Sequence, residues 1–224
     1  SQLRPDNASV IADIEDFPWE DEEFIDNRAA FQKGNVPMSV YEVYLGSFME
    51  PKEGEAYANY RDIAPRLIEY VKKMGYTHVE LMPVMEHPLD ESWGYQVIGY
   101  YSPTSRYGTP DDFMYFMNEM HKAGIGVILD WVPSFFAKDA HGLGNFDGTY
   151  LYGHLDERQR ENVAYDAYNF NYGRPQVSNF LIANGLYWVE HFHADGLRFS
   201  GLSSMLYMDY GKCDGQWVPN MYGG

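Results

Sequence analysis

From Met38 onward, short apolar stretches alternate with longer stretches in which apolar residues recur at helical spacing. Residues 39–45 are rich in Val and Tyr and predict a strand that ends at Gly46. Residues 61–74 predict a helix, because apolar side chains recur along one face: Ile63, Leu67, Tyr70 and Val71. The first two predicted elements after Met38 are therefore a strand and then a helix.

The same alternation continues to residue 199. The further predicted elements are a strand over 77–82, a helix over 110–124, a strand over 125–130, a helix over 175–193 and a short strand over 196–199. The run over 125–130 is almost continuously apolar, which is typical of a parallel strand covered on both faces. Residues 131–173 predict a long loop. Strands alternating with helices indicate an α/β protein with a parallel sheet, and barrel enzymes hold their sites on the loops that follow such strands.

The number of strand–helix units predicts a partial barrel. Four strands are predicted, whereas a closed (βα)8 TIM barrel has eight, so residues 38–224 predict about the first four units, or a half barrel. Residues 1–37 predict an acidic N-terminal arm with one short helix over 20–33 and little chemistry. The first and last strands of a half barrel would be open edges, which favour a homodimer unless the arm folds back over them.

Charge excludes two classes of partner. Sixteen basic against 33 acidic residues give a formal net charge of −17, which would repel nucleic acid and anionic membranes. No apolar run approaches the roughly 20 residues that span a bilayer, and residues 1–5 lack a hydrophobic signal core, so a cytoplasmic location is expected. The single cysteine, Cys213, has no disulfide partner and no metal-ligand spacing, and no metal or cofactor is expected. The aromatic content fits a large core as well as sugar stacking, so it decides nothing alone.

Candidate chemistry lies where the predicted strands end. The segment Trp93-Gly94-Tyr95-Gln96 offers stacking rings and hydrogen-bonding groups in a loop after the second strand. Asp130 ends the third strand, where a buried carboxylate is costly unless it is paired, and Arg198 on the fourth strand is its natural partner. From composition alone, a structural ion pair is favoured over catalysis.

Several ordered segments resemble one enzyme family. The fourth-strand segment Gly196-Leu197-Arg198-Phe199-Ser200 resembles the Gly-Leu-Arg-x-Asp motif of the α-amylase superfamily. Further matching segments make the resemblance specific to bacterial 1,4-α-glucan (glycogen) branching enzymes of glycoside hydrolase family 13: residues 38–43, 80–88, 92–96, 100–108, 125–133 and 204–210.

The resemblance implies a barrel that cuts an α-1,4-glucan and rejoins the piece through an α-1,6 link in glycogen biosynthesis. It implies that Tyr95 stacks beneath the sugar, that Asp130 supports the site and that Arg198 orients the nucleophile. Trp93 and Gln96 complete the implied glucan-binding set, together with Phe135 at a family histidine position.

The chain departs from the family at decisive positions. Ser200 stands at the nucleophile aspartate, and Phe135 and Tyr44 stand at two family histidines. The resemblance places the general-acid glutamate on a later strand, beyond Gly224. Because a retaining glycosidase uses two carboxylates ~5 Å apart, the chain alone is expected to be inactive, and whether it is an enzyme is left open. The alternative is a non-catalytic glucan-binding module or an engineered, self-assembling half-barrel scaffold.

Overall fold

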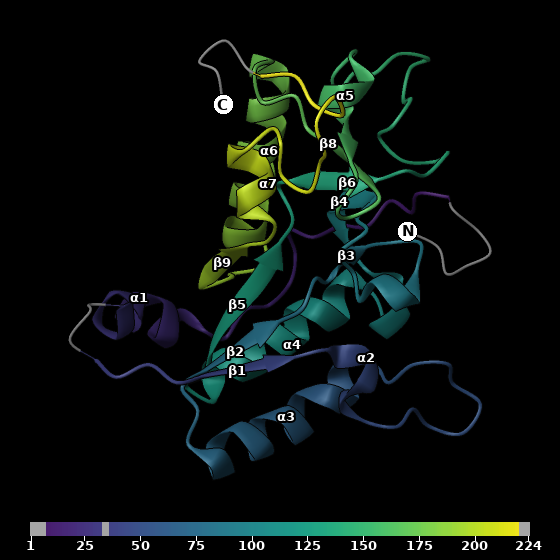
Figure 1. Ribbon diagram of the computed structural model, residues 1–224. Helices are drawn as coiled ribbons and strands as arrows, with labels where there is room; N and C mark the ends of the chain where they lie inside the picture. Colours follow the sequence, from purple (N-terminus) through teal and green to yellow (C-terminus); the bar gives the residue numbers. More distant parts are fainter. Residues whose placement is uncertain (1–7, 33–35, 220–224) are drawn as a thin grey trace. The chain divides into compact units, whose positions relative to one another are not determined.

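The computed structural model describes residues 8–32 and 36–219, which form two compact units interleaved along the sequence (Figure 1). The first unit contains the described residues up to Val84, together with Ser102–Asp130 and Leu186–Arg198. The second contains Met85–Tyr101, Trp131–Gly185 and the residues from Phe199 onward. The predicted absence of a signal core at residues 1–5 concerns positions outside the described residues.

A four-stranded sheet forms the centre of the first unit, in the order β1-β2-β5-β9. The strands are β1 (Val40–Val43), β2 (His78–Leu81), β5 (Gly126–Trp131) and β9 (Gly196–Phe199). β1 pairs with β2, and β2 with β5, in parallel. β9 follows β5 in the same direction, because Asp195 N donates to Val127 O and Ser200 N donates to Trp131 O. The predicted parallel α/β sheet is confirmed, and it is not closed into a barrel within the described residues.

Two capped helices pack against each other beside this sheet. Asn59 caps α3 (Tyr60–Met74) by accepting from Arg61 N, and α3 ends at Gly75 in the left-handed conformation, with φ 79°. Thr109 forms a capping box with Asp112 at the start of α4 (Pro110–Lys122). The aromatic rings of both helices meet in the core: Tyr60, Phe113 and Phe116. The predicted helices over 61–74 and 110–124 are therefore confirmed to within two residues.

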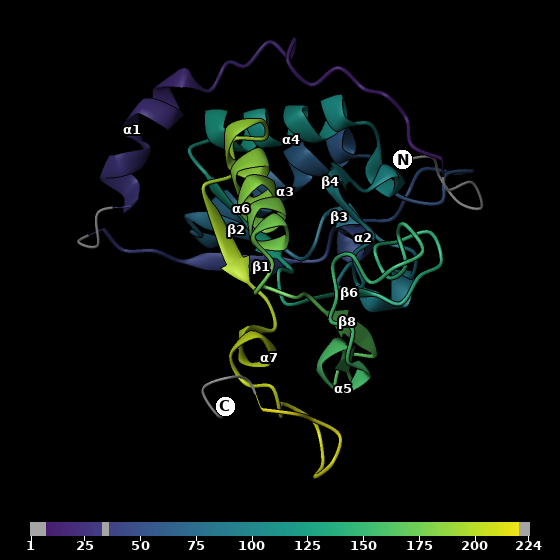
Figure 2. The same ribbon diagram turned by 90° about the horizontal axis from the view of Figure 1, so that it is seen from above.

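The N-terminal segment, residues 8–32, belongs to the first unit and ends in α1 (Glu22–Gln32). It runs past α4 before α1 begins (Figure 2). Glu20 N donates to Asn118 Oδ1 on α4 at 2.8 Å, and Lys122 contacts the Glu20 carboxylate at 2.7 Å. The predicted helix over 20–33 is present, two residues shorter at its start, and Lys33 lies outside the described residues.

Two predicted boundaries are wrong. The strand predicted over 39–45 ends at Val43, and residues 45–48 instead form the short helix α2 (Leu45–Phe48), whose Ser47 N donates to Tyr44 O. The helix predicted over 175–193 is α6 (Pro175–Glu190). His193 adopts φ 56°, a left-handed conformation that cannot continue an α-helix.

The second unit contains short strands, three of which lie in residues 131–173, the region predicted as a long loop. Its strands form a pair, β3-β4, and an antiparallel sheet in the order β6-β8-β7. They are β3 (Met85–Glu86), β4 (Gly99–Pro103), β6 (Phe135–Ala137), β7 (Glu161–Asn162) and β8 (Ala167–Asn169). Its short helices are a 3-10 helix, η1 (Asp90–Ser92), α5 (Glu157–Arg160) and α7 (Leu202–Leu206). Strands of two or three residues are too short for sequence periodicity to reveal.

On α6, the Asn184 side chain links two other segments of the second unit through hydrogen bonds. Its side chain accepts from Trp131 Nε1 at 2.8 Å and donates to Tyr100 O at 2.6 Å. Across the described residues, no helix combines the length and the apolar character that crossing a bilayer requires.

Candidate functional site

Three ionisable side chains from adjacent strands meet in the first unit. Asp130 is 1% exposed near the carboxyl end of β5, and its Oδ2 accepts from Arg198 Nη1 on β9 at 2.7 Å. Arg198 Nε lies 3.5 Å from Glu80 Oε1 on β2. The predicted contact between Asp130 and Arg198 is confirmed. Glu80 is an addition that sequence reasoning missed, although a carboxylate between the apolar residues Val79 and Leu81 was a usable signal.

One guanidinium in this group faces two carboxylates. Burial raises the pKa of Glu80, repulsion from Asp130 raises that pKa further, and Arg198 opposes both effects. The Arg198 side chain is about half exposed, whereas the Asp130 carboxylate is buried, so the cation is the member of the group that a solvent-borne ligand can reach. The group can therefore orient a polar ligand while it neutralises a buried acid.

Ser200 belongs to the second unit, and its backbone is fixed on both sides. Its N donates to Trp131 O at 2.9 Å, and its O accepts from Ser134 Oγ at 2.8 Å. Within the described residues, no imidazole or carboxylate forms a hydrogen bond with its hydroxyl. A serine without a general base is a poor nucleophile.

Gly201, which follows Ser200, is required by the turn at this position. Its φ is 71°, and a Cβ placed on it would lie 2.4 Å from Ser134 Oγ. Only glycine avoids both the backbone strain and this clash. The chain direction immediately after Ser200 therefore depends on one glycine.

The predicted glucan-binding aromatics also belong to the second unit. Trp93 is 56% exposed and ends η1 in a left-handed conformation, with φ 52°. Tyr95 is half-buried, and its N donates to Ser92 O at 3.0 Å. An exposed ring and a half-exposed ring on one short loop can offer apolar faces to a sugar.

Phe135 and Gln96 have structural contacts instead. Phe135 is 2% exposed and stacks on Tyr165 with ring centroids 4.6 Å apart. Gln96 Nε2 donates to Tyr165 O at 2.6 Å. Tyr165 also stacks on Tyr210. The ring at the family histidine position thus lies within an aromatic stack and presents little surface to a ligand.

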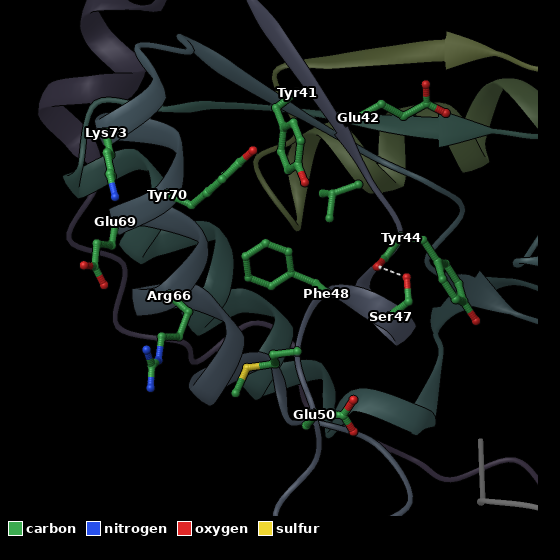
Figure 3. A pocket seen from close by; sticks show the side chains of 12 residues that line it. Tyr41, Glu42, Tyr44, Ser47, Phe48, Glu50, Arg66, Glu69, Tyr70 and Lys73 are labelled. Atoms are coloured by element: carbon green, nitrogen blue, oxygen red, sulfur yellow. Dashed lines mark hydrogen bonds between the residues drawn. The ribbon is translucent and has the colours of Figure 1, made fainter.

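A separate pocket of about 800 Å³ lies between β1, α2 and α3 in the first unit (Figure 3). Tyr41, Phe48 and Tyr70 form its apolar wall. Its charged lining residues are two basic and three acidic side chains: Arg66, Lys73, Glu42, Glu50 and Glu69. Tyr44, at the second family histidine position, also lines it. None of the residues implied to bind glucan does.

Comparisons with known proteins define the class of the chain. Residues 42–145 match the model of the alpha-amylase catalytic domain. A crystal structure described as an alpha-amylase from Salmonella typhimurium superposes with a TM-score of 0.69 at 28% identity, covering 87% of this chain and 30% of that one. The alpha-amylase of Geobacillus thermoleovorans, solved with acarbose, has a TM-score of 0.63 over 79% of this chain and 45% of that one. At 18% identity, this second likeness concerns the fold alone. The chain has an α-amylase-like fold, and residues 42–145 are similar in sequence to the alpha-amylase catalytic domain.

Curated relatives narrow the class further. The chain is 53% identical over 224 residues to the 1,4-alpha-glucan branching enzyme GlgB of Gloeobacter violaceus, covering 100% of this chain and 31% of that protein. It is 54% identical over 223 residues to the same enzyme from Hydrogenovibrio crunogenus, covering 100% of this chain and 30% of that protein. The chain is thus a relative of bacterial glycogen branching enzymes that spans about 30% of their length, and the resemblance is confirmed.

Proposed function

We propose that this chain contributes to the catalytic barrel of a 1,4-α-glucan branching enzyme. In this proposal, residues 1–37 are the acidic arm and residues 38–224 are the first four strand–helix units of a (βα)8 barrel, in a cytoplasmic protein. One observation carries the proposal: the buried Asp130 binds Arg198 where adjacent parallel strands end, in a chain about half identical throughout to branching enzymes. The carboxyl ends of such strands are where barrel enzymes hold their substrates.

The proposed ligand is an α-1,4-glucan. Tyr95 stacks beneath a sugar ring with Trp93 beside it on the same loop, Asp130 supports the site, and Arg198 orients the reacting group. The net charge of −17 favours a neutral polysaccharide over a polyanion. The proposed reaction uses carboxylates and needs neither metal nor cofactor.

Glucan binding is testable by electrophoresis through gels that contain amylose. Loss of a stacking ring in Tyr95→Ala or Trp93→Ala should weaken binding roughly two- to tenfold, the equivalent of about 0.5–1.5 kcal/mol. Tyr70→Ala is the matched control, because Tyr70 is an exposed ring in the pocket beside β1. Weaker binding in the control alone would indicate that glucan binds in that pocket and would contradict the proposal.

We further propose that this chain does not branch glucan by itself. A retaining displacement needs an ionised carboxylate to attack the sugar and to stabilise the positive charge of the transition state. Ser200 has a neutral hydroxyl at that position. Incubation with amylose should therefore yield no α-1,6 linkages above an enzyme-free blank, whereas any turnover that depends on the chain would refute this part of the proposal. Turnover in Ser200→Asp but not in the parent would identify this position as the block.

The alternative function is a non-catalytic, self-associating module, natural or engineered. In the described sheet, β1 and β9 are the edge strands, and Val40 and Phe199 are 36% and 50% exposed. Such edges offer unpaired backbone groups to a second copy, and a two-fold dimer closes after two copies.

A further inference from the structure

A buried cluster of histidines and carboxylates holds the N-terminal segment to the rest of the first unit. Asp21, which lies just before α1, is 2% exposed. Its Oδ2 lies 2.7 Å from His121 Nδ1 on α4 and 2.8 Å from His193 Nδ1. The pKa of Asp21 lies well below its usual range, because hydrogen bonds from both histidines outweigh the effect of burial. The ionised carboxylate only accepts, so both Nδ1 atoms donate to it.

His121 also uses its second nitrogen. Its Nε2 lies 3.0 Å from Asp195 Oδ2, at the beginning of β9. Asp195 is fixed there, because the same oxygen accepts from Val127 N at 2.6 Å. A histidine between two carboxylates can satisfy both only as the doubly protonated imidazolium. Burial opposes this charge, but the hydrogen bonds to Asp195 and Asp21 prevail and raise the pKa of His121.

The charges around His121 balance only while it is protonated. Arg28 on α1 pairs with Asp195 at 2.9 Å, so two carboxylates face one guanidinium and the imidazolium. Removing the proton from His121 takes one positive charge away from Asp21 and Asp195, and it turns a ring lone pair toward a carboxylate oxygen. Uncompensated buried charge is strongly unfavourable.

Three other described residues pack around the cluster, and none of them is placed to replace the charge of the proton. Phe24 stacks on the His121 ring at 4.4 Å. Burial lowers the pKa of His78 on β2 and favours its neutral form, although Asp195 opposes this effect. Lys122 points to the surface, where it pairs with Glu20 and Glu119.

His193 connects the cluster to the segment in two further ways. It keeps its left-handed φ of 56° while its ring stacks on Trp19, with centroids 3.8 Å apart. Its carbonyl accepts from Arg28 Nη2 at 3.1 Å. The N-terminal segment is thus attached through Trp19, Asp21, Phe24 and Arg28, all of which converge on the two histidines. The segment carries a built polar anchor, contrary to the sequence expectation of little chemistry there.

We propose that the proton on His121 is a latch that holds residues 17–28 on the first unit, and that raising the pH above neutrality releases this segment. The direction of this pH dependence follows from the pKa shifts of His121 and Asp21. Because the pKa of His121 is raised on folding, its contribution is complete below its ordinary value of 6.5 and is lost as the pH rises through the folded pKa. Because the pKa of Asp21 is lowered, its contribution is complete above its ordinary value of 3.8 and is lost as the pH falls through the folded pKa.

Hydrogen exchange measured by mass spectrometry tests the latch. Protection of residues 17–28 is compared at pH 6, 7.5 and 9 with that of α3 in the same molecule, which cancels the intrinsic pH dependence of exchange. The relative protection should fall by up to about tenfold for each pH unit between the ordinary histidine value of 6.5 and the folded pKa of His121, and it should level off above the folded pKa. A ratio that stays constant from pH 6 to 9 would overturn the proposal.

Variants distinguish the effect of the His121 proton on this segment from the effect of side-chain packing. His121→Gln should show low protection at pH 6 and little further change with pH. His191→Gln is the matched control, because His191 faces the same segment through an exposed partner, Glu15, at 3.3 Å, and it should keep the wild-type response. If His121→Gln does not fold, Asp21→Asn takes its place, and a wild-type pH response in whichever variant folds would refute the latch.

The protonation state is directly measurable by NMR. Long-range ¹H–¹⁵N spectra should show both His121 ring nitrogens protonated at pH 6, with a transition above the ordinary histidine value. A singly protonated ring at pH 6 would refute the proposal whatever the exchange data show.

Discussion

Replacing Arg198 with methionine should lower the free energy of unfolding, because it removes the hydrogen bond from Arg198 to the buried Asp130 carboxylate. Methionine retains much of the apolar stem but removes the guanidinium that bonds Asp130 at 2.7 Å and faces Glu80 at 3.5 Å. Leaving a buried charge unpaired typically costs about 3–5 kcal/mol. Because the Arg198 side chain is 47% exposed, water already screens part of this interaction, so we expect a loss below that range, about 2–3 kcal/mol at pH 7.5.

The stability loss in Arg198→Met should also change with pH in a definite direction. Without the guanidinium, the folded-state pKa of Glu80 should rise further, because burial and repulsion from Asp130, which already raise it, are no longer opposed by Arg198. A carboxyl with a raised folded pKa destabilises the protein above its unfolded value and ceases to do so once it is protonated. The loss in Arg198→Met should therefore shrink between pH 7.5 and pH 5.

Urea unfolding followed by circular dichroism measures the loss. Arg66→Met is the control, because Arg66 is exposed on α3, and its change should stay within about 0.5 kcal/mol. The double variant Asp130→Asn/Arg198→Met should be more stable than Arg198→Met alone, because it no longer contains the buried Asp130 carboxylate. A loss in Arg198→Met that is below 0.5 kcal/mol, or that is equal at both pH values, would refute the reasoning.

Three further predictions concern backbone and assembly. Gly201→Ala should cost about 1–3 kcal/mol in urea unfolding, more than Gly148→Ala, because both have positive φ but only Gly201 also lacks room for a Cβ; equal losses would mean that the contact with Ser134 is relieved at no cost. Thr109→Ala should cost about 1 kcal/mol by removing the capping box with Asp112, and an unchanged midpoint would show that the cap contributes nothing. Sedimentation at several concentrations should show a dimer that dissociates on dilution if the edge strands self-associate, whereas a monomer at every concentration would rule out the self-associating alternative.

Long elements were predictable because their apolar periodicity is local. The strand over 196–199 coincides with β9, and α3 differs by one residue from the predicted helix. By contrast, β6, β7 and β8 gave no signal, since strands of two or three residues owe their structure to distant partners. The short helix α2 was predicted as strand for the same reason: Val and Tyr enrichment continues past the residue where pairing stops.

The candidate site was predictable only in part. An acid at the end of an apolar strand needs a partner, and this rule identified Asp130 with Arg198. Glu80 was missed, because its importance depends on the register that places β2 beside β5. Phe135 was expected among the glucan-binding residues, yet its ring is buried against Tyr165, which lies 30 residues further along the chain.

The sequence by itself determined the alternation of strands and helices, the acidic charge, the kinship with branching enzymes and the absence of a carboxylate at residue 200, because each is a property of residue identity and local order. Only the tertiary structure decided which ionisable groups meet. Asp21 and His121 are 100 residues apart in sequence and 2.7 Å apart in space, and hydrogen bonds to the two carboxylates on either side of His121 raise its pKa. A pKa depends on burial and on nearby charge, and both exist only once the chain has folded.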